Sequence, residues 1–239
     1  MMKPLLPPIA RAVLACLLAA ATIAHAAPKV VKATYNGFMN GLPIGTLSEQ
    51  FESDGSAYRL VSETKPVGLA ALIQRQPLHF SSTGSIASGG LQPTLFEARR
   101  NANEAPQVSA EFDWPQKQLT LKHQGKTESV SLPPGTQDRL SVMYQFIFLP
   151  SDRIRKLDFS MTNGRKLDQY QYRLAGEVEI DTGMGRLKTL HLVKQREPGD
   201  TVNEVWLSPR HQNFPVKLLI VERDGMRLEQ VIQSLELRD

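Results

Sequence analysis

Hydrophobic and polar positions alternate along most of the chain, the pattern of β-strands with one covered face. The clearest case is the segment 108–114, Val-Ser-Ala-Glu-Phe-Asp-Trp. A period of two is expected of an antiparallel sheet with one face on the core and the other in water. About a dozen such segments follow one another, separated by turn dipeptides such as Asn40-Gly41 and Asp224-Gly225. No helix is predicted between successive strands, which argues against a parallel sheet with helical crossovers.

One stretch departs from this pattern. The apolar side chains of 138–149 lie nearly all round a helical wheel, so a helix here would be buried on most sides. Asp138 can cap its first turn, and Pro150 would end it. A buried strand is the alternative, because periodicity alone does not decide a short apolar run. A second short helix over the sheet or its rim is predicted within 67–76, where apolar residues recur at helical spacing.

Together these elements predict a mainly β fold. We expect one curved antiparallel sheet, a half-barrel or barrel, wrapped round the helix at about 138–149. A sheet of this size twists and curls, which leaves a concave face. The helix would fill part of that face, and any unfilled part would be an apolar groove or pocket. A concave face that is completely packed is the alternative.

The first 26 residues have the pattern of an export signal. Lys3 and Arg11 precede an apolar core, and Ala24-His25-Ala26 is a small-x-small cleavage pattern. We therefore expect cleavage near Ala26/Ala27, a single β-rich domain at 27–239 and a periplasmic location. Cys16 lies inside the signal with little apolar sequence before it, which disfavours a lipid anchor there.

Composition narrows the range of functions. Cys16 is the only cysteine, so residues 27–239 contain no thiol for disulfides, nucleophilic attack or zinc binding. Lys and Arg number 28 against 24 Asp and Glu, and loss of Lys3 and Arg11 with the signal leaves a net charge of +2. No polybasic run occurs, so a nucleic-acid partner is not expected. The group Arg153, Arg155 and Lys156 is interpreted as a solvated turn. No later segment reaches the roughly 20 apolar residues of a membrane span.

No motif predicts an active site. Ser62 and Lys65 have Ser-x-x-Lys spacing, but in a strand residues three apart point to opposite faces. Glu177 and Glu179 share one face of a predicted strand, as solvated residues do. Two pairs of carboxylates, Asp152 with Asp158 and Glu177 with Glu179, leave a glycosidase open. The histidines at 79, 123, 191 and 211 have no ligand spacing, so neither a metal nor another cofactor is expected.

Several landmarks, in order along the chain, resemble those of the exported bacterial family called domain of unknown function 3108. They are Tyr35 and Gly37, Ile44-Gly45, Gly84-Ser85-Ile86, Gly90-Leu91-Gln92-Pro93, Phe96, Asp138-Arg139-Leu140-Ser141, Met184-Gly185, Glu204-Val205-Trp206-Leu207-Ser208 and Phe214-Pro215-Val216. The resemblance implies an exported, β-rich protein and supplies no catalytic residues. In layout alone, a curved sheet with an internal helix is similar to the periplasmic lipoprotein carriers.

These observations lead to three hypotheses. The first is a non-enzymatic exported protein that binds or carries an apolar, lipid-like ligand or an envelope partner. Its groove would lie near Tyr144, Phe146 and Trp206, large aromatics whose default role is core packing. The second is a purely structural or interaction protein with a filled core. The third is a cell-envelope hydrolase without a recognisable motif.

Overall fold

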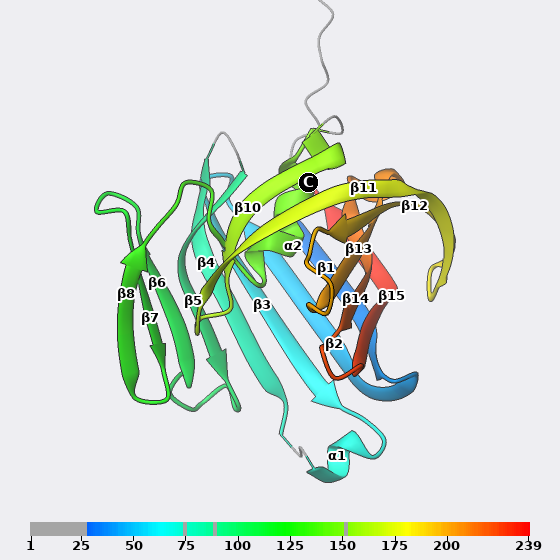
Figure 1. Cartoon of the computed structure of the whole chain (residues 1–239), viewed down its shortest axis with the longest axis horizontal. Coiled ribbons are helices and arrows are strands. Elements are labelled where there is room, and N and C mark those ends of the chain that lie inside the picture. Colours follow the sequence, from blue (N-terminus) through cyan, green and yellow to red (C-terminus); the bar gives the residue numbers. More distant parts are fainter. Residues whose placement is uncertain (1–27, 74–75, 88–89, 151–152) are drawn as a thin grey trace, which may run out of the picture.

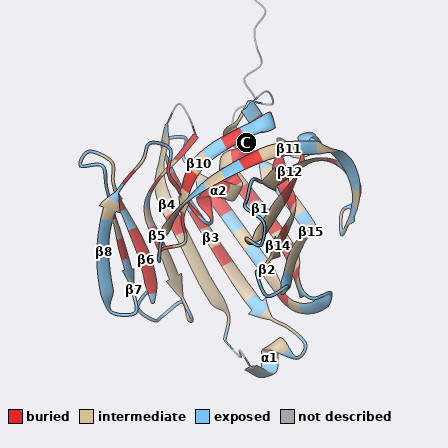
Figure 2. Ribbon diagram, in the orientation of Figure 1, coloured by how far each residue is buried: buried red, intermediate tan, exposed pale blue. Residues whose placement is uncertain are grey.

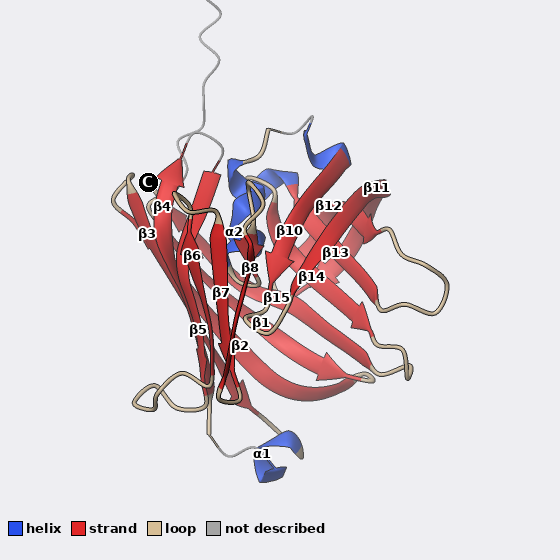
Figure 3. Ribbon diagram, turned by 60° about the vertical axis from the view of Figure 1, so that its left-hand side comes forward, coloured by secondary structure: helices blue, strands red, loops and turns tan. Residues whose placement is uncertain are grey.

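The computed structural model describes residues 28–73, 76–87, 90–150 and 153–239. Within these ranges the chain forms one large antiparallel sheet with a few short helices (Figures 1 and 3). The predicted signal at 1–26, including Cys16, lies outside the described residues, as does Asp152. No helix in the described ranges is long and apolar enough to cross a membrane.

The sheet contains fifteen strands in the described part of the chain, against the dozen or so predicted. In chain order they are β1 (Val30–Met39), β2 (Leu42–Ser53), β3 (Ala57–Pro66), β4 (Leu78–Ala87), β5 (Gly90–Arg99), β6 (Val108–Asp113), β7 (Gln118–His123), β8 (Lys126–Ser131), β9 (Gln137–Asp138), β10 (Lys156–Thr162), β11 (Leu167–Thr182), β12 (Gly185–Lys194), β13 (Val202–Ser208), β14 (Phe214–Val221) and β15 (Arg227–Arg238).

Each strand pairs with its neighbours in sequence, except that β8 does not pair with β9, and β1 also pairs with β15. The ends of the described chain therefore meet in the middle of the sheet. The free edges are β8 and β9, which follow each other in the chain. All pairings are antiparallel except that of β9 with β10. The sheet is thus open between β8 and β9, and the helical segment begins directly after this opening.

Local sequence explains the tightest hairpins. Asn40 and Gly41 join β1 to β2 with φ of 51° and 79°, and Gln124 and Gly125 join β7 to β8 with φ of 50° and 73°. Two successive positive φ values are the signature of the two-residue turn that matches the twist of antiparallel strands. The hairpin predicted at Asn40-Gly41 is confirmed.

The predicted helix at 138–149 is shorter in the structure. Its α-helical part is α2 (Ser141–Gln145), continued by a single 3₁₀ turn, η1 (Phe146–Phe148). Asp138 belongs to β9, so the helix cannot begin there. Leu149 is extended, with φ −89° and ψ 132°, because Pro150 disfavours the helical conformation of the residue before it.

The second predicted helix, at 67–76, is also shorter. It consists of α1 (Ala70–Ile73), and residues 74–75 lie outside the described ranges. The segment is held at the rim, where the Val67 amide donates to the Ile44 carbonyl of β2 at 3.0 Å. Figures 1 and 3 show α1 standing off one end of the sheet. Leu69 and Leu72 are 75% and 71% exposed, so this helix does not cover the sheet as an amphipathic helix would.

Glycine often marks a turn, but Gly176 lies inside β11, where the register with β12 shifts between Leu174 and Gly176. This bulge lets one 16-residue strand bend. The tip of the β11–β12 hairpin reaches β15, because the Gly183 amide donates to the Ile232 carbonyl at 3.0 Å. A Cβ at Gly183 would lie 2.7 Å from the Gln233 Cα.

The buried hydrophobic residues form two clusters. Figure 2 marks the buried residues in red along the ribbon. The larger joins residues of β1–β7 and of β12–β15 with Tyr144 of α2, whose ring stacks on Phe51 at 5.3 Å and meets Phe214 edge-on at 5.4 Å. The smaller joins Phe146 to residues of β10–β13. The helical segment thus contributes to both clusters, which places it where the two arms of the sheet face each other.

We predict that Gly183→Ala lowers the free energy of unfolding by about 1–3 kcal/mol, because the added methyl group overlaps the β15 backbone. Gly176→Ala is the matched control: nothing lies within 4 Å of its Cβ position, and its φ is not positive. The control is expected to change stability by less than about 0.5 kcal/mol or to raise it slightly. Urea denaturation measures both. Equal losses in the two variants would contradict the docking of this hairpin on β15.

Candidate functional site

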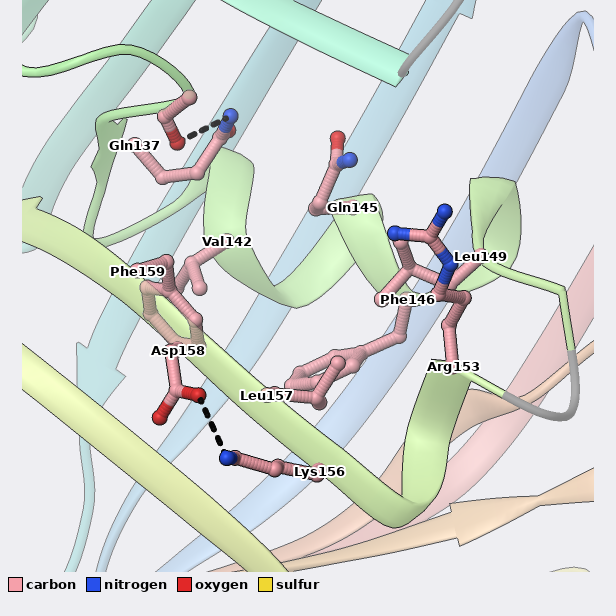
Figure 4. Close-up of a pocket in the computed structure, with 11 residues that line it drawn as sticks. Gln137, Val142, Gln145, Phe146, Leu149, Arg153, Lys156, Leu157, Asp158 and Phe159 are labelled. Carbon is pink, nitrogen blue, oxygen red and sulfur yellow. Dashed lines mark hydrogen bonds and ion pairs between the residues drawn. The ribbon is translucent and has the colours of Figure 1, made fainter.

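A cavity of about 230 Å³ lies at the open side of the sheet, between the helical segment and β10. Figure 4 shows the side chains around it. They come from the loop before β9, from β9, from α2 and η1, from the turn η2 (Arg153–Arg155) and from the start of β10. The lining residues are Gly135, Gln137, Val142, Gln145, Phe146, Leu149, Arg153, Lys156, Leu157, Asp158 and Phe159.

One wall of the cavity is apolar. Val142, Phe146 and Leu157 are buried, with exposed fractions of 3%, 1% and 8%. Leu149 and Phe159 are partly buried and continue this wall outward. Phe159 also belongs to a row of stacked rings with Tyr170 and Tyr172 of β11, at centroid distances of 5.9 and 6.0 Å. The rings fix the apolar wall on the β10 side.

The rim is charged and accessible. Arg153, Lys156 and Asp158 are exposed side chains at this rim. Asp158 is paired with Arg173 of β11 at 3.1 Å and with Lys156 at 3.9 Å. Arg153 makes no ion pair with any described residue. The rim therefore carries a cation that no described carboxylate neutralises.

Gln137 is the one lining residue with an unsatisfied buried atom. Only 3% of the surface of Gln137 is exposed. The amide nitrogen donates to the Leu91 carbonyl at 2.8 Å and approaches the Gly135 carbonyl at 3.5 Å. Among the described residues its Oε1 is the only buried side-chain oxygen or nitrogen without a hydrogen-bond partner. Buried polar atoms are normally paired, so this oxygen calls for a specific explanation.

The helical segment behind the cavity is anchored by Asp138. Its Oδ1 accepts the Leu140 and Ser141 amides at 2.8 and 2.9 Å, so Asp138 satisfies amides at the start of the helix, as predicted. Its Oδ2 accepts the Ser82 hydroxyl of β4 at 2.5 Å, and that hydroxyl meets the Tyr58 hydroxyl of β3 at 2.9 Å. Burial raises the pKa of Asp138, and these hydrogen bonds oppose the rise.

A second polar group faces the interior beside α2. The Tyr144 hydroxyl donates to Glu49 Oε2 of β2 at 3.2 Å. Burial raises the pKa of Glu49 from 4.5 to about 7, against the lowering effects of Tyr144, Ser62 and Arg139. Arg139 stands over the Phe80 ring at 4.8 Å, and its pKa is lowered by desolvation although its side chain is exposed.

The three residues predicted near a groove lie in different places. Phe146 lines the cavity. Tyr144 lies in the core, between Phe51 and Phe214. Trp206 lies in the larger core cluster, on the opposite face of β13 from Val205. Its ring stacks on the His191 ring at a centroid distance of 4.4 Å, and the Lys217 ammonium lies over it at 5.0 Å. The structure therefore brings together Phe146 and four residues that were not singled out as a site: Gln137, Val142, Leu157 and Phe159.

The other residues weighed for chemistry are dispersed. Ser62 is buried on one face of β3 and Lys65 is exposed on the other, paired with Glu63 at 2.9 Å, so the Ser-x-x-Lys spacing brings no base to the serine. Glu177 and Glu179 are exposed on β11. Of the histidines, His79 lies 3.6 Å from Glu63, His191 bonds Glu204 at 2.7 Å, and His211 bonds Ser208 at 2.8 Å. Within the described ranges no three His, Cys, Asp or Glu side chains gather.

A comparison with models of protein families identifies the family of this chain. The family model described as protein of unknown function (DUF3108) matches residues 31–231. The chain belongs to this family. The resemblance seen in the sequence landmarks is therefore confirmed over most of the chain. No curated protein matches the sequence.

Two solved structures are similar to this chain to different degrees. A β-barrel-like protein of domain of unknown function DUF1849 from Brucella abortus has a TM-score of 0.53 at 9% identity, covering 89% of this chain and 99% of its own. A candidate lipoprotein from Parabacteroides distasonis has a TM-score of 0.40 at 10% identity, covering 88% and 97%. The first similarity supports a β-barrel-like fold and says nothing of activity.

Two landmarks of the family resemblance meet at the helical segment. Asp138-Arg139-Leu140-Ser141 supplies the anchoring carboxylate described above. Leu91, in Gly90-Leu91-Gln92-Pro93, accepts from Gln137 through its carbonyl and donates its amide to Gln145 Oε1 at 2.7 Å. A Cβ at Gly90, where φ is +111°, would overlap Gln145. The landmarks thus hold α2 and β9 against β5, which positions the cavity wall.

The raised pKa of Glu49 predicts a pH dependence of stability. Between pH 4.5 and about 7 the folded protein holds this proton more firmly than the unfolded chain, so the free energy of unfolding falls as pH rises through this window. The loss attributable to Glu49 is at most about 3 kcal/mol. In Glu49→Gln this loss should disappear. Urea denaturation of both proteins from pH 4 to 8 measures it, with the exposed Glu52→Gln on the same strand as the control. If Glu49→Gln has the same pH dependence as the wild type, Glu49 is not the cause.

Proposed function

We propose that the protein is a non-enzymatic binding or carrier protein of the bacterial envelope, and that it holds an apolar, lipid-like ligand in the cavity beside α2 and η1. The observation that carries the proposal is the cavity itself, with an apolar wall of Val142, Phe146, Leu157 and Phe159 at the open side of the sheet. A sheet curled round a helical segment supplies such a space without a separate binding domain. Apolar area removed from water contributes about 25 cal/mol per Å² to binding.

The size of the cavity bears on the ligand. At about 230 Å³ it is smaller than the roughly 300–1,000 Å³ of pockets that enclose drug-sized molecules. It therefore suits one part of a longer molecule, such as the end or the first segment of an acyl chain. The remainder would run along the opening between β8 and β9.

The predicted export signal at 1–26 supports a periplasmic location. An envelope protein partner at the same opening is compatible with this reading. A purely structural role with a filled core accounts less well for a cavity with an apolar wall. A hydrolase accounts less well for the lining, because its described residues include no serine, cysteine or histidine.

The test is native mass spectrometry of the protein purified from a periplasm after export of the full chain, combined with organic extraction. A co-purifying lipid or other apolar molecule near one per chain is expected. A bare polypeptide mass that does not change when dodecanoate or a phospholipid is added would refute the proposal.

We predict that Val142→Phe abolishes ligand binding, because the larger side chain occupies the cavity that the ligand would fill. Val178→Phe makes the same change at a site that is 38% exposed on β11 and outside the cavity, and it should leave binding unchanged. Isothermal titration with dodecanoate measures both. Retained binding in Val142→Phe, with a circular dichroism spectrum like that of the wild type, would place the ligand elsewhere.

A further inference from the structure

Four exposed apolar side chains gather at one end of the sheet. The described residues expose five large hydrophobic side chains, and the four at this end are Met39 (38% exposed), Leu42 (63%), Leu69 (75%) and Leu72 (71%). Single apolar side chains are normal on a protein surface, whereas a group of them marks a contact with a partner or a membrane. We propose that this apolar end docks the protein on an anionic phospholipid membrane and inserts its leucines among the lipids. None of the four residues lines the cavity, so the proposal goes beyond the ligand proposed above.

Backbone contacts bring the four side chains to one place. Met39 and Leu42 are paired directly across the β1–β2 turn. The segment that carries α1 lies against the start of β2, because the Val67 amide donates to the Ile44 carbonyl at 3.0 Å. Figures 1 and 3 show α1 projecting from the sheet. The β1–β2 turn and α1 therefore form one protruding end.

The two leucines of the α1 segment lie on the same side of it. The Leu72 amide donates to the Leu69 carbonyl at 3.1 Å, and residues three apart in a helical turn are neighbours on its surface. Both side chains are mostly in water, so their transfer to an apolar surrounding is favourable. This pair is therefore placed to enter a lipid surface together.

The protruding end contains no charged residue. Residues 33–48, which include the β1–β2 turn, and residues 66–74, which include α1, have no Asp, Glu, Lys or Arg. A charge carried into the apolar part of a membrane would be strongly unfavourable. This end can enter the lipid surface without burying a charge.

The charges beside the apolar end are ordered along the strands. Lys65 of β3 is 66% exposed and pairs with Glu63 at 2.9 Å, and Arg227 of β15 is 45% exposed and pairs with Glu229 at 3.2 Å. In each pair the cation lies two residues nearer the apolar end, and the glutamate is the less exposed partner. The neighbouring β14–β15 turn adds exposed charges of both signs, on Arg223 and Asp224. Lipid phosphates at the apolar end would thus meet Lys65 and Arg227 before either glutamate, which favours an anionic membrane.

The exposed area favours a membrane over a protein partner or a second copy of the chain. A stable protein interface buries about 800 Å² on each partner. Four side chains at the exposed fractions given above offer well under this area. Membrane binding needs no complementary partner surface, because its strength comes from inserted apolar area together with attraction to anionic lipids.

The first experiment tests the leucines. The periplasm-purified protein is sedimented with phosphatidylcholine vesicles that contain or lack phosphatidylglycerol, and we expect tighter binding to the anionic vesicles. The double variant Leu69→Ser/Leu72→Ser should bind them about tenfold more weakly or worse, because two apolar side chains are lost from the contact. Val178→Ser, at the fifth exposed apolar position, is the control and should bind like the wild type. Circular dichroism checks that both variants fold.

The second experiment tests the charges. Lys65→Gln should weaken binding to the anionic vesicles by about threefold to fivefold and reduce its dependence on salt. Lys166→Gln is a matched control, because Lys166 is also 66% exposed and pairs with Asp168 at 2.7 Å. It makes the same change in net charge outside the apolar end and should leave binding unchanged. Equal losses in the two variants would overturn the role of Lys65.

The third experiment detects insertion. In Leu69→Trp, the fluorescence of the new indole, after subtraction of the wild-type signal, should shift to shorter wavelength when anionic vesicles are added. Val178→Trp should show no shift. Binding without a shift in Leu69→Trp would overturn the insertion of the leucines.

The remaining outcomes separate the membrane, other partners and the proposed ligand. Absence of binding to anionic vesicles, or equal binding by the double leucine variant, overturns the proposal. A wild-type dimer in sedimentation without vesicles, with a monomeric double variant, also overturns it and assigns the apolar end to contact between two copies. Val142→Phe should leave vesicle binding unchanged, and the double variant should leave dodecanoate binding unchanged. Loss of vesicle binding in Val142→Phe would overturn docking through the apolar end, whereas failure of dodecanoate to bind would bear on the cavity alone.

Discussion

The arrangement of the interior depends on one buried carboxylate, that of Asp138. No part of this residue is exposed, and an isolated charge there would be strongly unfavourable. The chain meets this cost with two backbone amides at the start of α2 and with the Ser82 hydroxyl of β4. The same carboxylate therefore starts the helical segment and fixes it to a strand 56 positions earlier in the sequence. Removing either the carboxylate or the serine would leave a buried polar group unpaired.

The helical segment fixed in this way keeps the sheet open. The segment contributes Tyr144 to one core cluster and Phe146 to the other, so the two arms of the sheet pack on it instead of on each other. The free edges are protected in ways that limit pairing with other chains. β8 is exposed and bears Lys126 and Glu128, and β9 is only two residues long. The cavity lies between this helical segment and the strands β9 and β10, so the segment that joins the two core clusters also forms one side of the candidate site.

Much of the fold could be predicted from the sequence because strands and turns leave local signals. Alternation of side chains gave the strands, and the positive φ of Asn40 and Gly41 follows from residue types that tolerate it. The predictions were wrong where one local sequence signal is compatible with two different structures. Gly176 is of a residue type that often marks turns but lies at a bulge, and the largely apolar run after Asp138 suggested a longer helix than the five α-helical residues found. Pro150 did act on the residue before it, and the result was an extended Leu149 after a 3₁₀ turn.

The sequence by itself determined the β-rich class, the family, the likeness to exported proteins and the lack of cysteine in residues 27–239, because each is read from composition or from neighbours in the chain. Only the tertiary structure decided which aromatic residues meet. Val205 and Trp206 are adjacent and both buried, yet alternation along β13 sends them to opposite faces and into different core clusters. The candidate site depends on the parallel pairing of β9 with β10 and on the Leu91 carbonyl of β5. These contacts join segments far apart in sequence, and nothing in the local pattern around Gln137 marks its oxygen as unpaired.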